Sequence, residues 1–458
     1  MSYLLAPPLL ARRSSDEYKP LTHRRCDLAA IYRVTAVLKD GSHTSLGSAQ
    51  SYLESRLGTV ATLRAIDAEA GGGFYDLPAD AAHDRALADE LLAPRGPVID
   101  VQTHLVDPRR WPVGGQALEG FLRMVEPQRW SGSIDPDMLD GRHWAAQVFG
   151  GSETAVALIT ALPGTPDSMV LPNSEIAAVR DVVDRYAGTG RVLTHTIVHP
   201  NAGDADREKL VWWRDTLSPS AWKVYTLWGP PSQGGIGFEL DDERTGIPFL
   251  EAVRNVGPRI VCAHKGIAGP VPGSGPVGES PRDIGPAAAL FPDIDFVVYH
   301  SGYEIDEDRQ EAAYDSDGSG VNRLVASLEN AEIPPHRNVW AELGSTWFLM
   351  LRRPAEAAHV LGKLLLAVGP ERIVWGTDSI WYGPPQPLID AFRAFSIPDA
   401  FCEQHGYPRL TPEIKQRILA TNATTLYGLD ADALPKGRTV EELSWLDEVR
   451  AGLSRRNV

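Results

Sequence analysis

Four short segments combine histidine, aspartate or glutamine with a preceding run of apolar residues. They are Asp100-Val101-Gln102-Thr103-His104, Cys262-Ala263-His264-Lys265-Gly266, Tyr299-His300-Ser301-Gly302 and Trp375-Gly376-Thr377-Asp378. Imidazole and carboxylate groups bind divalent ions and exchange protons near neutral pH. One histidine at a strand end is usually a hydrogen-bonded structural residue. Three histidines and an aspartate at four strand ends indicate one shared site, provided that these ends meet in space.

Eight apolar, β-rich runs occur from residue 98 onward, and a helical stretch follows each. The runs are 98–106, 154–162, 192–198, 222–227, 259–264, 295–300, 338–343 and 372–377. Near-continuous apolar strands are typical of a parallel sheet that is buried on both faces. Their starts are about 30 to 55 residues apart, which suits eight βα units closed into a TIM barrel. No GxGxxG motif follows an early strand, which disfavours an open dinucleotide-binding sheet.

We therefore expect an α/β protein, a (β/α)8 TIM barrel with a small N-terminal α+β extension. The extension covers residues 1–95, with a strand at 30–39 and helices near 50–68 and 79–92. Pro94-Arg95-Gly96-Pro97 cannot continue a helix and is the expected linker. Residues 96–458 form the barrel with C-terminal helices. Long loops at 266–286 and 303–335 are expected to shape a pocket, because loops after barrel strands lie on the catalytic face.

The composition is that of a globular enzyme, with 43% hydrophobic residues and a net charge of -16 over 458 residues. A protein this acidic repels nucleic acid and anionic membranes unless it has a basic stripe, and none is present. Three widely spaced cysteines and the lack of a run of about 18 apolar residues favour a cytoplasmic protein without a membrane span. We expect a homo-oligomer with a small-molecule substrate.

The four polar segments resemble the amidohydrolase superfamily over about residues 97–430. The closest likeness is to the branch that contains aminocarboxymuconate-semialdehyde decarboxylase and related hydrolases and decarboxylases. The resemblance implies that His104, His264 and Asp378 are metal ligands, and that His300 is catalytic or adjacent to the metal. The mixed nitrogen and oxygen ligands favour Zn or Mn. Gln102 is predicted to point to the same side of its strand as His104. It stands where the family has histidine or glutamate, and its neutral amide oxygen is a weaker ligand or holds a metal-bound water.

Such a site implies hydrolysis by a metal-activated water, with Asp378 as ligand or base and His300 as the group that stabilises an oxyanion or protonates the leaving group. Non-oxidative decarboxylation on the same site is the alternative. A third possibility is a metal-free barrel that acts as a binding protein.

The substrate is expected to be small and aromatic or carboxylated, because aromatic residues gather at the strand ends. Lys223 lies within a strand, and it is predicted either to bind substrate or to pair with Glu342. Arg282, in a loop predicted at the rim of the barrel, could bind a carboxylate group of the substrate. His195, His199 and Glu304 are expected to support the site. The predicted substrate-binding residues are Lys223, Tyr225, Trp228, Tyr303, Trp347, Trp381 and Arg282.

Overall fold

Eight parallel strands form the centre of the protein in a computed structural model, which describes residues 6–15, 18–40, 46–127, 129–267, 277–434 and 443–455. The strands follow one another around a single sheet in chain order. They are β1 (Val98–Thr103), β2 (Thr154–Ile159), β3 (Val192–Ile197), β4 (Ala221–Tyr225), β5 (Ile260–His264), β6 (Asp295–Tyr299), β7 (Val339–Glu342) and β8 (Ile373–Val374). All eight predicted strands are therefore confirmed.

The barrel closes between β8 and β1, just beyond the two residues of β8 itself. Val101 N–H donates to Trp375 O at 2.9 Å, and Asp378 N–H donates to Gln102 O at 2.8 Å. Thr103 and Ser379 form a parallel bridge. This seam makes the predicted TIM barrel complete, with its strands buried on both faces.

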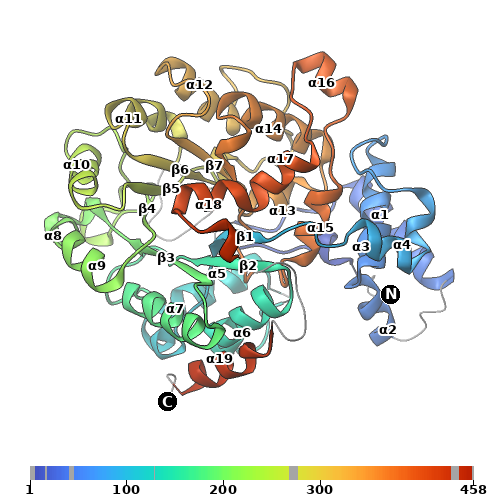
Figure 1. Ribbon diagram of the computed structural model, residues 1–458, viewed down its shortest axis with the longest axis horizontal. Helices are drawn as coiled ribbons and strands as arrows, with labels where there is room; N and C mark the ends of the chain where they lie inside the picture. Colours follow the sequence, from blue (N-terminus) through green and yellow to red (C-terminus); the bar gives the residue numbers. More distant parts are fainter. Residues whose placement is uncertain are drawn as a thin grey trace.

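Helices surround the barrel, and α17 and α18 cross the end of it that faces the viewer in Figure 1. The helices that follow the strands are α5 (Gln116–Val125), α6 (Gly141–Ala145), α7 (Asn173–Ala187), α8 (Asp204–Glu208), α9 (Leu210–Leu217), α10 (Gly246–Val256), α11 (Ile284–Leu290), α12 (Val321–Asn330), α13 (Thr346–Met350), α14 (Pro354–Ala367), α15 (Gln386–Ala394), α16 (Asp399–His405), α17 (Pro412–Gln416), α18 (Asn422–Tyr427) and α19 (Trp445–Ser454). Within the predicted loop 303–335, residues 321–330 are helical. Of the predicted loop 266–286, residues 268–276 lie outside the described chain.

Helix α7 illustrates how local sequence connects helix and strand. It ends at Gly188, whose φ of 69° lies in the left-handed region that glycine adopts without a steric penalty. Asp184 Oδ1 then accepts the N–H of Arg191 at 2.7 Å and of Val192 at 3.2 Å. These bonds direct the chain into β3, so that its apolar face meets the core.

The N-terminal extension consists of helices, and the predicted strand at residues 30–39 is wrong. Its helices are α1 (Arg25–Asp40), α2 (Leu46–Leu53), α3 (Arg56–Glu69) and α4 (Arg85–Leu91). Ala30, Ile31, Val34 and Leu38 recur at helical spacing and are buried, so the periodicity of this segment is that of an amphipathic helix. Among its described residues, the isolated bridge from Tyr75 to Phe395 is the β-type pairing.

The break between α2 and α3 has a local cause in Ser55. Its hydroxyl accepts the N–H of Gly58 at 3.2 Å and caps the new helix, so one predicted helix becomes two. Figure 1 shows these helices beside the barrel, near α15. No described helix has the length and apolar character needed to cross a lipid bilayer.

A buried ion pair anchors the chain after β5. Lys265 Nζ lies 2.7 Å from Asp283 Oδ2, and both side chains are inaccessible to solvent. Lys265 Nζ also donates to Gly278 O at 2.8 Å, while Asp283 Oδ2 accepts the N–H of Leu240. The pair ties the segment after β4 to the start of α11.

We predict that Asp283→Ala lowers the free energy of unfolding by about 3–5 kcal/mol, because it leaves the Lys265 ammonium buried without its counter-ion. Asp293→Ala is the matched control. It removes a carboxylate that pairs with Arg254 at the surface, where solvent-exposed ion pairs contribute little to stability. Chemical denaturation measures both values, and equal losses in the two variants would contradict the prediction.

Candidate functional site

The carboxylate of Asp378 is the point on which the polar groups at the seam converge. His104 Nε2 lies 2.9 Å from Asp378 Oδ1, and Gln102 Nε2 donates to the same oxygen at 3.1 Å. Ser345 Oγ donates to Asp378 Oδ2. All four side chains are buried. Groups from β1, the end of β7 and the end of β8 thus hold this carboxylate in one orientation.

The other two predicted histidines form a second group at the ends of β5 and β6. Their rings make an edge contact, with centroids 4.6 Å apart, and Tyr225 stacks on His264 at 4.9 Å. His300 Nδ1 donates to Gly344 O at 2.7 Å, because a carbonyl oxygen can only accept. By the same argument, His264 Nε2 donates to Ile267 O at 3.2 Å.

Glu342, at the end of β7, is buried beside His300. Burial raises the pKa of Glu342 to about 7, although the nearby His300, the N–H groups of His300 and Gly344, and the Lys223 cation each oppose that shift. A carboxyl group with such a pKa can give or take a proton near neutral pH. An added Cβ at Gly376 would overlap Glu342 Oε1, which explains the glycine that precedes Thr377 in the segment after β8.

Asp100 is a second buried carboxyl group, and its hydrogen bonds lie within the seam between β1 and the segment after β8. It accepts the N–H and the hydroxyl of Thr377 and the N–H of Gln102. Burial raises the pKa of Asp100 to about 7, against the effect of these hydrogen bonds. Asp100 therefore links the residues that precede Asp378 to the strand that carries Gln102.

Lys223 lies inside the barrel among aromatic rings. Its Nζ is 3.4 Å from the ring centre of Tyr299 and 4.9 Å from that of Tyr225, which are cation–π distances. The Lys223 cation also lowers the pKa of His195, although burial is the larger cause of that shift. The predicted partner Glu342 is close enough for its pKa to be affected by Lys223.

Strained backbone marks the same strand ends. His300, Ser345 and Asp378 have φ values of 61°, 54° and 61°, a region that side chains other than glycine rarely adopt. Such residues cluster at functional sites, where the surrounding structure holds them in place. The strain therefore supports a site at the carboxyl ends of β6, β7 and β8.

The predicted aromatic residues divide into three groups. Tyr225 contacts His264, and the ring of Trp381 lies 6.3 Å from that of His104, so both are near the site. Trp228 packs against His199 at 4.8 Å and lines a different cavity of about 470 Å³. The remaining two, Trp347 and Tyr303, are buried, and their polar atoms bond to Leu388 O and to Glu356 respectively.

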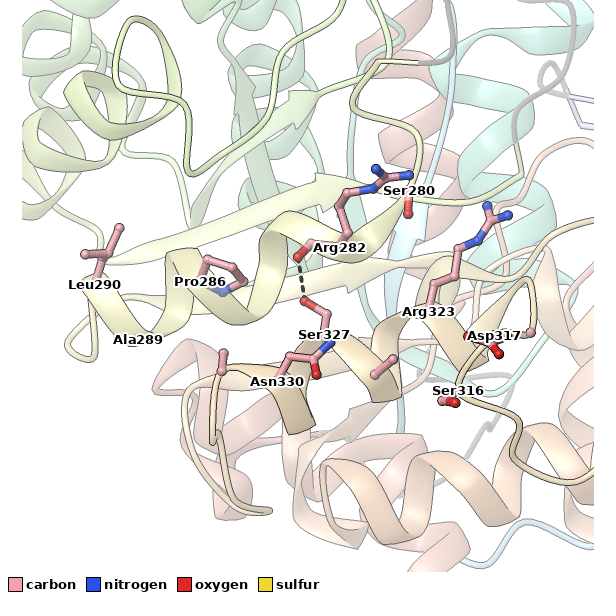
Figure 2. A pocket seen from close by; sticks show the side chains of 13 residues that line it. Ser280, Arg282, Pro286, Ala289, Leu290, Ser316, Asp317, Arg323, Ser327 and Asn330 are labelled. Carbon is pink, nitrogen blue, oxygen red and sulfur yellow. Dashed lines mark hydrogen bonds between the residues drawn. The ribbon is translucent and has the colours of Figure 1, made fainter.

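Arg282, which was predicted to bind a substrate carboxylate, lies away from the group of residues around Asp378. Its exposed side chain lines a surface cavity of about 760 Å³ together with Arg323, between α11 and α12. Figure 2 shows both guanidinium groups at one end of this cavity and Leu290 at the other. None of the other predicted site residues lines it. Arg323 also pairs with Glu304, so that glutamate is engaged at the surface.

The described residues do not fit a complete metal site. No group of three histidine, cysteine, aspartate or glutamate side chains among them is placed to hold one ion. Asp378 contacts His104 and Gln102, whereas the Nε2 of His264 is engaged with Ile267 O. Among the described residues, Gln102 Oε1 is buried without a hydrogen-bond partner and could serve as a further oxygen ligand. The set Gln102, His104, His264 and Asp378 is therefore not assembled, and its metal assignment stays a prediction.

Asp100, Ser345 and Tyr18 were not predicted as parts of the site, Tyr382 was predicted only as one of the aromatic residues at the strand ends, and Glu342 was predicted as a structural partner of Lys223. Tyr382 OH lies 2.5 Å from Ser345 Oγ and 2.8 Å from Tyr18 OH. Asp100 and Glu342 could have been identified from the sequence, because a charged residue within an apolar strand is costly to bury and often has a functional role. The hydroxyl groups lie in irregular segments, where the sequence has no periodicity that would place them.

A family comparison supports the predicted class. Residues 237–429 match the family model described as amidohydrolase, a range that contains β5 to β8 and extends through α18. The predicted resemblance to the amidohydrolase superfamily is thus confirmed over this part of the chain, and the predicted enzyme class agrees with it. A search of curated proteins returns no match to the chain.

Solved structures that are similar to this one in backbone fold include decarboxylases and a putative hydrolase. A 2,6-dihydroxybenzoate decarboxylase in complex with 2,6-dihydroxybenzoate is 16% identical, with a TM-score of 0.43 over 73% of this chain and 99% of that one. A putative 2-pyrone-4,6-dicarboxylic acid hydrolase from Pseudomonas putida is 16% identical, with a TM-score of 0.41 over 73% and 98%. A manganese-bound 5-carboxyvanillate decarboxylase from Novosphingobium aromaticivorans is 12% identical, with a TM-score of 0.47 over 74% and 99%. With TM-scores below 0.5, the fold rests on the strand order instead.

The raised pKa of Asp100 predicts a pH dependence of stability. Its ordinary pKa is near 3.9 and its folded pKa is about 7. Its contribution is fully present below pH 4 and is lost as the pH rises through 7. In the unaltered protein, the free energy of unfolding should fall as the pH rises from 4 to 7. In Asp100→Asn this fall should be smaller by up to about 1.4 kcal/mol per pH unit.

Denaturant unfolding between pH 4 and pH 8 measures this slope. Asp89→Asn, which alters an exposed carboxyl group, is the control and should keep the full slope. A slope that is the same in Asp100→Asn as in the unaltered protein would mean that Asp100 is already ionised at low pH.

Proposed function

We propose that the protein is a hydrolase of the amidohydrolase type that acts on a small aromatic or carboxylated molecule at the carboxyl end of the barrel. The observation that carries the proposal is the carboxylate of Asp378, held by His104, Gln102 and Ser345. A carboxylate fixed in this way is suited to remove a proton from an attacking water. The three free cysteines agree with the proposed cytoplasmic location.

Other buried groups would complete the reaction. His300 donates through Nδ1 to Gly344 O, which fixes its ring, and the protonated imidazolium would be the proposed donor that gives its Nε2 proton to a substrate oxygen or leaving group. Glu342 would return a proton near neutral pH, because burial raises its pKa to about 7. Tyr225 and Trp381 would contact a flat substrate, and Lys223 would attract its carboxylate. Water adds across the bond, so that one product receives its oxygen and the other its second proton.

Non-oxidative decarboxylation is the second candidate, and the burial of the site favours it. The side chains of His104, His300, Glu342 and Asp378 are almost fully shielded from water. Exclusion of water destabilises the charge of a substrate carboxylate and so favours the loss of carbon dioxide, after which a proton must be delivered to carbon. Glu342, with a pKa of about 7, is a suitable source of that proton.

Isotope labelling separates the two reactions. Purified protein is incubated with a panel of small aromatic esters, lactones and hydroxybenzoic acids. Hydrolysis would place oxygen from H₂¹⁸O in the product, whereas decarboxylation would release carbon dioxide and place deuterium from D₂O on carbon. Mass spectrometry of the products detects either label. Absence of both across the panel would favour the metal-free binding protein.

We predict that Asp378→Asn lowers kcat/KM by a factor on the order of 100 or more on any substrate found, because the amide cannot accept a proton. Asp308→Asn, on an exposed loop after β6, is the matched control and should retain activity. Steady-state kinetics measure both variants. A fully active Asp378→Asn protein would remove the observation on which the proposal rests.

Zinc or manganese is proposed to bind only weakly at Gln102, His104, His264 and Asp378, and no step above depends on it. The amide of Gln102 is a weak donor, so we predict that the protein retains less than one added ion per chain after gel filtration. Gln102→His should retain more, since it adds an imidazole. Elemental analysis measures the content, with His83→Ala, an exposed histidine, as the control. One tightly held ion per chain in the unaltered protein would contradict this prediction.

A further inference from the structure

The N-terminal segment, residues 6–24, lies across loops at the carboxyl end of the barrel in its described parts. Ser14 N–H donates to Glu126 Oε1 at 2.6 Å, just after α5. Thr22 Oγ1 donates to Glu307 Oε2 at 2.8 Å, after β6. Arg24 Nη2 donates to Arg352 O at 2.7 Å, after α13. Three loops that follow different strands thus fix the path of this segment over the proposed active site.

Tyr18 connects this segment to the proposed site through its hydroxyl. Its side chain is 2% exposed, and its hydroxyl lies 2.8 Å from Tyr382 OH. Tyr382 OH is 2.5 Å from Ser345 Oγ, which donates to Asp378 Oδ2. Four side chains therefore form one continuous chain of hydrogen bonds from the extension to Asp378.

The direction of this chain follows from counting hydrogens. A hydroxyl group has one hydrogen to donate, and Ser345 gives its hydrogen to Asp378. The hydrogen between Ser345 and Tyr382 must then come from Tyr382, and the hydrogen between the two tyrosines must come from Tyr18. Burial raises the pKa of both tyrosines well above the usual value, so both keep these hydrogens at neutral pH.

We propose that Tyr18 is a positioning residue for the reaction, acting through Tyr382 and Ser345 to hold Asp378 with its Oδ1 toward His104. The proposal rests on the proposed role of Asp378 as the base. Successive hydrogen bonds that point the same way strengthen one another, so the outermost donor affects the innermost acceptor. The N-terminal extension would therefore contribute a group on which the geometry of the active site depends.

Tyrosine NMR tests this chain without any substrate. The protein is labelled with ¹³Cζ-tyrosine, and the signal of Tyr382 is assigned as the one lost in Tyr382→Phe. We expect Tyr18→Phe to shift this signal, because the oxygen of Tyr382 loses its donor. Tyr75→Phe is the matched control: Tyr75 also belongs to the extension, and its hydroxyl donates to Leu351 O at 2.6 Å, outside the chain. The control should leave the Tyr382 signal in place.

A double-mutant cycle on stability gives an independent result. Tyr18 and Ser345 are joined only through Tyr382 in the chain of hydrogen bonds. If that chain exists, Tyr18→Phe should lower the denaturation midpoint by less than half as much in the Ser345→Ala background as in the unaltered protein. Tyr75→Phe should lower it equally in both backgrounds. Additive effects of Tyr18→Phe and Ser345→Ala, or an unshifted Tyr382 signal, would overturn the proposal.

Activity adds a third measurement where a substrate is found. Tyr18→Phe is expected to lower kcat about tenfold with KM changed less than twofold, because the variant keeps the ring and loses only the positioning bond. Tyr75→Phe should keep the original kcat. An unchanged kcat in Tyr18→Phe, with a shifted Tyr382 signal, would overturn the positioning role. If the proposed function is wrong, the unaltered protein will be inactive on the whole panel of substrates. The NMR experiment needs no substrate, so it would still test the chain of hydrogen bonds.

Discussion

The seam between β1 and β8 is the constraint on which the rest of the site depends. The segment after β8 pairs with β1 through Trp375, Asp378 and Ser379, and Asp100 fixes Thr377 within it. Because the backbones of Gln102 and Asp378 are hydrogen bonded to each other, their side chains and that of His104 must meet at one place. If the barrel stayed open at this seam, the carboxylate of Asp378 would be separated from the imidazole of His104 and the amide of Gln102.

The seam and the neighbouring ends of β6 and β7 bring together groups that do not favour burial. Asp100 and Glu342 are both surrounded by protein, and burial raises the pKa of each to about 7. Carboxyl groups placed in this way reduce stability once they must ionise. The strained backbones of His300, Ser345 and Asp378 add to the cost. The apolar strands and the surrounding helices supply the stability that keeps these groups in place.

The barrel could be predicted from the sequence because its strands are continuous apolar runs, and the histidines and Asp378 could be placed because they follow those runs directly. The segment 30–39 was mistaken for a strand because the helical spacing of its apolar residues was not recognised. The position of Arg282 depends on a long loop, and loop paths have no periodic signal. Contacts such as that of Tyr18 with Tyr382 join distant segments through single hydroxyl groups, which no local pattern reveals.

The separation of Tyr18 and Tyr382 by 364 positions has a consequence for how the protein assembles. A growing polypeptide releases its first residues long before the last barrel strand has been synthesised. Tyr18 then has no partner until that final part emerges and the ring of strands closes, because contacts between distant positions form late in folding. Catalytic competence would therefore appear only after the whole barrel exists, and a nascent or truncated chain could fold its local helices without forming a working centre.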